Sequence, residues 1–170
     1  MSYDFNVDEV FEMAEQIEKN GAVFYRKMAE SISDAPVSQL LLDLAAMEAE
    51  HEKVFASMRA NLADQEQKPT VFDPEGESAL YLRALADLRV FDEEGKKDFI
   101  LSGDLPEQDR IRKILRAAIG LEKESIVFYL GMKELVPERF GKDKIDKIIK
   151  QEMGHIRLLS GFQKKLLGAG

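Results

Sequence analysis

The 170-residue chain contains no cysteine, no tryptophan and only two histidines, His51 and His155. Without cysteine it can have no disulfide framework, thiolate zinc site, iron–sulfur cluster or cysteine nucleophile. No apolar run approaches the ~20 residues of a membrane-spanning helix, and no basic-then-apolar export signal opens the sequence. The net charge of −8 argues against a nucleic-acid-binding surface. We therefore expect a cytoplasmic protein that binds neither nucleic acid nor membrane.

What the chain does contain is helical periodicity. Apolar or small residues recur at steps of three and four along four long segments. Asn6 and Glu9 resemble a capping box, which predicts that the first helix begins near Val7. Breaker residues or polar runs predict the other helix boundaries: 31–36, 64–69, Pro106, Pro137 and the closing glycine-rich residues 168–170.

Two short connections, 32–35 and 137–141, join these segments into two antiparallel hairpins, residues 7–64 and 106–167. The connection 65–105 is too long for a structureless loop. Its helical pattern from Glu77 to about Val90 predicts a crossover that carries short helices. Two helix hairpins joined by one long crossover describe a ferritin-like four-helix bundle. We predict an all-α protein in which residues 1–170 form a single domain.

Each apolar stripe is interrupted by ionisable side chains at positions that should face the core. These side chains belong to Glu18, Glu48, His51, Glu122, Glu152 and His155. Four of the six form Glu-x-x-His motifs, at 48–51 and 152–155, and the i, i+3 spacing places both side chains of a motif on one helix face. The two motifs contain both histidines of the chain.

The two hairpins repeat one pattern. In both, a lone glutamate precedes the Glu-x-x-His motif by 30 residues, and folding at the predicted turn brings the two level. The halves also match at an offset of 104 residues, so that Val23–Tyr25 corresponds to Val127–Tyr129. This repeat predicts an internal two-fold with two equivalent metal-binding hairpins.

Four carboxylates in an apolar core are unfavourable unless they are protonated or compensated. Two divalent cations would balance four negative charges, and neutral imidazoles would complete the coordination. One Glu-x-x-His motif in a helix is usually accidental, but two motifs aligned with two further glutamates favour metal binding over coincidence. Oxygen and nitrogen donors without thiolate suit iron or manganese.

At these residues the sequence resembles the rubrerythrin-like branch of the ferritin-like di-iron carboxylate proteins. The resemblance implies terminal carboxylates at Glu18 and Glu122, bridging carboxylates at Glu48 and Glu152, and one histidine ligand per metal, His51 and His155. It implies two iron ions, with manganese or a mixed-metal pair as alternatives. It also implies a homodimer that reduces hydrogen peroxide with electrons from an external donor, such as a rubredoxin or a flavoprotein.

The sequence departs from that family's pattern in two ways. Rubrerythrins usually carry a seventh ligand, a glutamate three residues after the third-helix glutamate, where this chain has Ser125. They also usually carry a rubredoxin domain built on four cysteines, which this chain lacks. The alternatives are a ferroxidase that oxidises Fe(II) with dioxygen or peroxide, a manganese catalase, and a non-catalytic helical module with a structural metal.

Tyr25 and Tyr129 each lie seven residues after a proposed ligand, on the same stripe. Each is either a core tyrosine with a satisfied hydroxyl, a donor to a bridging glutamate, or a radical or electron relay. We favour a structural role beside the ligands. Glu15 is either an outer partner of the site or a surface residue, and Glu50 is expected to face solvent because i+2 residues do not share a helix face.

Overall fold

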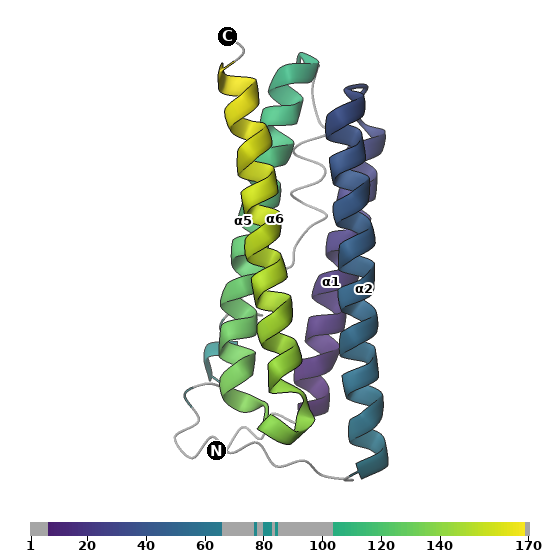
Figure 1. The fold of residues 1–170 in the computed structure, drawn as a ribbon, viewed down its shortest axis with the longest axis vertical. Coiled ribbons are helices and arrows are strands. Elements are labelled where there is room, and N and C mark those ends of the chain that lie inside the picture. Colours follow the sequence, from purple (N-terminus) through teal and green to yellow (C-terminus); the bar gives the residue numbers. More distant parts are fainter. Residues whose placement is uncertain (1–6, 66–76, 78–79, 83, 85–103, 169–170) are drawn as a thin grey trace.

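The computed structural model describes residues 7–65, 77, 80–82, 84 and 104–168. Its main elements are α1 (Val7–Glu30), α2 (Ala35–Gln65), α5 (Glu107–Leu135), the short 3-10 helix η1 (Glu138–Phe140) and α6 (Lys142–Gly168). Helices α1 and α2 form one antiparallel hairpin and α5 and α6 form the other, with the two turns at opposite ends of the bundle (Figure 1). The predicted all-α four-helix bundle is confirmed.

The helix boundaries follow from local chemistry. At the first turn, the carboxylate of Asp34 accepts a hydrogen bond from the Val37 N–H at 3.0 Å and so caps α2. The carboxylate of Glu107, in the first turn of α5, accepts the N–H of Asp34 at 3.1 Å and ties this turn to the other hairpin. At the second turn Gly141 has a φ of 98°, a left-handed conformation that glycine adopts without strain.

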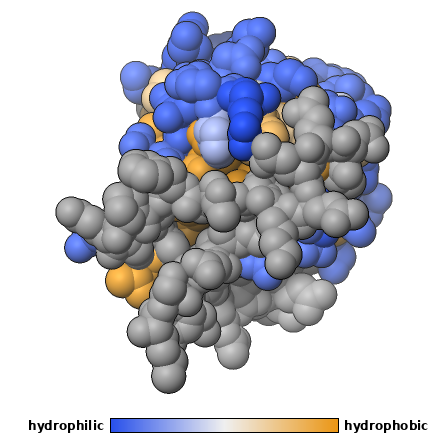
Figure 2. Space-filling model, turned by 90° about the horizontal axis from the view of Figure 1, so that it is seen from below, coloured by the Kyte–Doolittle hydropathy of each residue, from blue (hydrophilic) through white to orange (hydrophobic). Residues whose placement is uncertain are grey.

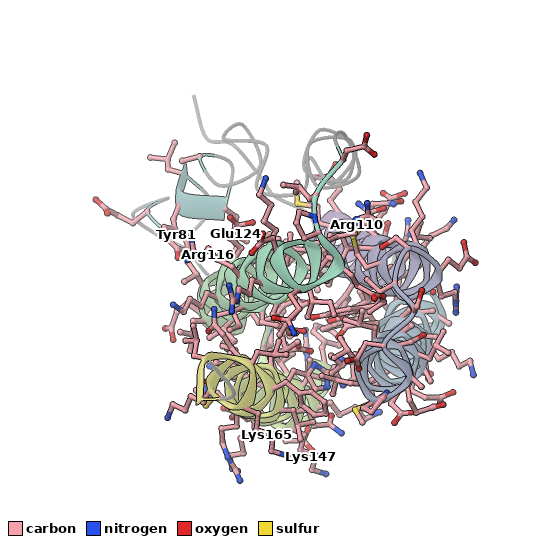
Figure 3. All side chains as sticks on the ribbon, turned by 90° about the horizontal axis from the view of Figure 1, so that it is seen from above. Tyr81, Arg110, Arg116, Glu124, Lys147 and Lys165 are labelled. Carbon is pink, nitrogen blue, oxygen red and sulfur yellow. The ribbon has the colours of Figure 1, made fainter. Side chains whose placement is uncertain are left out.

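Part of the predicted crossover lies within the described residues. Glu77, residues 80–82 and Ala84 are helical, as expected from the pattern that begins at Glu77. The rest of 65–105, and Asn6 of the proposed capping box, lie outside the described residues. Tyr81 lies against the outer side of α5 (Figure 3), where its hydroxyl donates to the carbonyl of Val127 at 3.1 Å. A Cβ on Gly131 would lie 2.5 Å from the Tyr81 ring, so glycine permits this close contact.

The apolar core is divided into two clusters, one toward each end of the bundle. The lower cluster includes Phe11, Phe55, Phe128, Met132 and Ile145. The upper cluster includes Phe24, Leu41, Leu44, Ile114 and Leu115. All six predicted polar core residues lie along the helices between the two clusters. Packing within each hairpin is more extensive than packing between hairpins.

The outside of the bundle is largely hydrophilic. Seen from below, polar residues dominate the described rim and apolar residues lie toward the middle (Figure 2). Lys147 and Lys165 of α6 point away from the bundle (Figure 3). Among the described helices, none has both the length and the apolarity required to cross a membrane.

Candidate metal centre

The six predicted site residues come from all four long helices and converge in the middle of the bundle. They are all buried: Glu18 on α1, Glu48 and His51 on α2, Glu122 on α5, and Glu152 and His155 on α6. The helical period explains their convergence, since each replaces a core residue on an apolar stripe. The structure therefore brings together every residue of the predicted set.

The donor atoms form two overlapping sets, each with its members within 4.8 Å of one another. The first contains Glu18, Glu48, His51 and Glu152; the second contains Glu48, Glu122, Glu152 and His155. Only the two glutamates of the Glu-x-x-His motifs belong to both sets. Each set therefore offers three carboxylates and one imidazole, and it draws them from both hairpins.

The histidines turn their Nδ1 atoms toward the carboxylates. Nδ1 of His51 lies 2.8 Å from Glu152 and 3.2 Å from Glu18. Nδ1 of His155 lies 3.1 Å from both Glu48 and Glu152. The two rings stack, with centroids 5.7 Å apart and planes 17° from parallel. Nδ1 is therefore the nitrogen through which either histidine would bind a metal.

The shared carboxylates carry a further indication of a cation. Among the described residues, Oε1 of Glu48 and Oε1 of Glu152 are buried and accept no hydrogen bond of acceptable geometry, although each lies close to a histidine Nδ1. A buried carboxylate oxygen without a well-formed hydrogen bond is costly, and a metal ion bound between it and the histidine would remove the cost. The residues present thus fit a pair of divalent cations in donor type, charge and proximity.

Without metal, the cluster retains protons. Burial raises the pKa of Glu18, Glu48 and Glu122 above 4.5, and in Glu48 the neighbouring charges of Glu18 and Glu152 add to the effect. Burial would also raise the pKa of Glu152, but hydrogen bonds from Glu122, His155 and His51 outweigh it and lower that pKa below 4.5. Among the four carboxylates the surroundings thus favour the ionised form of Glu152, whereas burial shifts the other three toward the protonated form.

The histidines are the positive partners in the metal-free cluster. Burial disfavours the charged form of His51, but hydrogen bonds to Glu152 and Glu18 outweigh it and raise its pKa to about 10. The pKa of His155 is likewise raised to about 12, against burial, by hydrogen bonds to Glu122, Glu152 and Glu48. Because metal ligands must be deprotonated, metal binding at neutral pH has to release protons from this cluster.

Both tyrosines lie beside the ligands, as favoured from the sequence, and each bonds to a glutamate. The hydroxyl of Tyr25 on α1 donates to Oε1 of Glu122 on α5, and the hydroxyl of Tyr129 on α5 donates to Oε1 of Glu18 on α1. The alternative of a bond to a bridging glutamate is therefore wrong: both bonds go to the unshared carboxylates, and both cross between hairpins. Burial, followed by the charge of the bonded glutamate, raises the pKa of each tyrosine well above 10, which keeps each hydroxyl a donor.

The other candidate positions lie outside this cluster. Glu50 is exposed and pairs with Lys53 at 2.5 Å, as expected for a solvated residue. Glu15 is half-buried and lies 3.7 Å from Arg59, so it belongs to an ion pair between α1 and α2. Ser125 is half-buried and adds no carboxylate beside Glu122.

A glycine on α1 makes room for one shared carboxylate, a feature that the sequence pattern did not single out. A Cβ on Gly21 would lie 2.9 Å from Oε2 of Glu48. Because that oxygen is the end of a flexible side chain, a larger residue at this position would displace the carboxylate rather than the backbone.

Gly21→Ala is expected to weaken metal binding about 10-fold without lowering the stability of the metal-free bundle. Alanine improves helix propensity by ~1 kcal/mol, while its methyl group moves the Glu48 carboxylate. Gly120→Ala is the matched control, since no described atom outside its own helix turn lies within 4 Å of the added Cβ. Thermal melts and Co(II) titrations test this, and equal metal affinities in the two variants would contradict it.

Comparisons with known proteins agree with this geometry. A family model described as Rubrerythrin matches residues 9–94, about half of the chain. The structure is similar to the crystal structure of a protein from Thermotoga maritima described as ferritin-like and diiron-carboxylate. The TM-score is 0.62 at 23% identity, over 96% of this chain and 98% of that one. This similarity shows the ferritin-like fold. No curated protein matches the chain.

Proposed function

The chain belongs to the rubrerythrin family, and from this premise we propose that it is a di-iron oxidoreductase that reduces hydrogen peroxide. The observation that carries the proposal is the pair of buried donor sets that share Glu48 and Glu152. A single structural metal would need one closed set of ligands, whereas two sets with common carboxylates would suit two cations side by side. Adjacent ions are suited to two-electron chemistry on one small substrate.

Each residue of the cluster has a defined part in this proposal. Glu18 and His51 would hold one ion, Glu122 and His155 would hold the other, and the two shared glutamates would contribute to both positions. The four carboxylates balance the charge of two divalent ions. Iron is the proposed metal on donor type and family membership, and manganese shares the same donor preference.

When bound, two ferrous ions would supply the two electrons that, with uptake of two protons, convert hydrogen peroxide to two waters, and they would add Lewis acidity at its oxygens. The chain fixes the surroundings of that reaction. The lower and upper apolar clusters exclude water from above and below the ligands. The hydroxyls of Tyr25 and Tyr129 each donate to Oε1 of one unshared carboxylate and so orient that carboxylate within the cluster.

The electron donor in this proposal is a separate protein, a rubredoxin or a flavoprotein. The 170 residues contain no cysteine, so they hold no rubredoxin-type iron site. The second candidate is ferroxidase activity. It is favoured by Ser125, because the chain has no seventh carboxylate at this position that could bind one iron when its oxidation state changes. Light scattering tests the homodimer expected from the family.

Anaerobic loading with Fe(II) is expected to reach two ions per chain, measured by metal analysis after desalting. One equivalent of peroxide should then oxidise both ions faster than one equivalent of dioxygen does, followed by stopped-flow absorbance. Reduced rubredoxin or a reduced flavoprotein should restore the starting spectrum. A plateau at one ion contradicts the two-metal centre, and faster oxidation by dioxygen favours the ferroxidase.

A further inference from the structure

The outer nitrogens of the two histidines have partners that the metal-binding motif does not include. Nε2 of His51 lies 3.2 Å from Oε1 of Gln151, and Nε2 of His155 lies 3.2 Å from Sδ of Met47. Both contacts cross between α2 and α6, and therefore between the two hairpins. When Nδ1 of a histidine binds a metal, the neutral ring carries its proton on Nε2, which can then donate outward to this contact.

These two contacts occupy equivalent places in the internal repeat. Met47 immediately precedes Glu48 and Gln151 immediately precedes Glu152, at the same offset of 104 residues as the ligands. The residue before each shared glutamate thus contacts the histidine of the other hairpin. The arrangement is reciprocal, as the two-fold requires, but the two residue types differ.

The difference in residue type matters because the acceptors differ in strength. An amide oxygen is a full hydrogen-bond acceptor, whereas a thioether sulfur is a weak one. A histidine ligand whose outer N–H is well accepted is better oriented and more basic, and loss of such a partner typically costs 10–100-fold in metal affinity. His51 has the strong acceptor, Gln151, and His155 has the weak one, Met47.

The two metal positions are matched in donor type. Each donor set has three carboxylates and one imidazole, and each unshared glutamate accepts one tyrosine hydroxyl. We infer that Gln151 and Met47 are positioning residues that make the two metal positions unequal, with the position at His51 filled first and the position at His155 the labile one. This inference rests on the proposed two-metal function.

The test is a reciprocal exchange of the two residues, followed by Co(II) titration of the full chain. The wild type should bind in two steps about 10-fold apart or more. Met47→Gln should tighten the weaker step, and Gln151→Met should weaken the tighter step about 10-fold. The control is Met153→Gln on α6, since Met153 is also exposed, at 49% against 40% for Met47.

The double exchange, Met47→Gln with Gln151→Met, should restore two separate steps with their places reversed. Removing an unshared ligand identifies each step. In the wild-type background, Glu122→Gln should remove the weak step and retain the tight one. In the double exchange, Glu18→Gln should remove the weak step and retain the tight one. Helix content, measured by circular dichroism, should be the same in all of these variants.

Proton NMR of the Co(II)-loaded protein gives a readout that general packing would not alter. The exchangeable imidazole N–H of His155 should shift and exchange more slowly with water in Met47→Gln, while that of His51 stays unchanged. If the binding steps and N–H signals of Met47→Gln and Gln151→Met change no more than those of Met153→Gln, this inference is wrong and the proposed function is unaffected. A wild-type chain that takes up no Co(II) would overturn the proposed function and this inference together.

Discussion

Glu48→Gln is expected to abolish the two-metal centre while the helical bundle stays folded. The carboxylate of Glu48 belongs to both donor sets, so its charge is lost at both metal positions at once. Removing one partner of a buried charge pair costs about 3–5 kcal/mol, which corresponds to at least ~100-fold in affinity at each position. Glu152→Gln should have the same effect, because Glu152 is the other shared ligand.

The control for this prediction is Glu18→Gln, which removes a ligand from one set only. That variant should still bind one ion, and Glu48→Gln should bind neither at micromolar Fe(II) or Co(II). In metal-free form, Glu48→Gln should melt no lower than the wild type at neutral pH, since it replaces a carboxyl that burial penalises. Uptake of two ions by Glu48→Gln would refute its assignment as a shared ligand.

The second large effect is a reversal of the pH dependence of stability when metal is bound. In metal-free protein, the pKa values of Glu18, Glu48 and Glu122 are raised above 4.5, so these groups stabilise the fold fully below pH 4.5. That stabilisation is lost as the pH rises through the pKa values of the folded state. Glu152 acts in the opposite sense: its lowered pKa stabilises the fold above 4.5, and the contribution is lost as pH falls toward its folded value.

The histidines extend the trend to higher pH. Their raised pKa values, about 10 for His51 and about 12 for His155, give a stabilisation that is complete below 6.5. It disappears as pH rises through those folded values. Above pH 4.5 all groups except Glu152 therefore act in one direction, and the free energy of unfolding of the metal-free bundle should fall from about pH 5 to pH 9.

Metal should reverse this trend, because cations compete with protons for the same ligands. The free energy of unfolding of the loaded protein should rise from about pH 5 to pH 7, where the metal-free protein becomes less stable. Urea unfolding of chelator-treated and Co(II)-loaded protein over this range measures both profiles. Identical profiles would show that the six side chains do not exchange protons for metal.

Most of the fold and the ligand set could be predicted because both depend on local patterns. Pro137 and Asp34 mark turns whatever surrounds them. A glutamate such as Glu18 is conspicuous where a helical stripe requires an apolar residue. The hairpin register followed from the turns alone, since residues equidistant from a tight turn face each other.

The features that could not be predicted are those that cross between hairpins. The pattern placed Tyr25 near a ligand, but its acceptor, Glu122 on α5, lies 97 residues away along the chain. The contact of Met47 with His155 likewise depends on how α2 faces α6. No turn specifies that arrangement, and helix packing admits several crossing geometries.

The helices make fewer contacts between the two hairpins than within each hairpin, so a bound metal can help to hold the hairpins together. The joint between hairpins has the sparser contacts, and at this joint each donor set takes ligands from both sides. Ions bound at this interface would link the two hairpins, and their binding free energy would oppose separation of the hairpins. When the metal-free bundle is unfolded, we therefore expect the two hairpins to separate from each other before either hairpin opens.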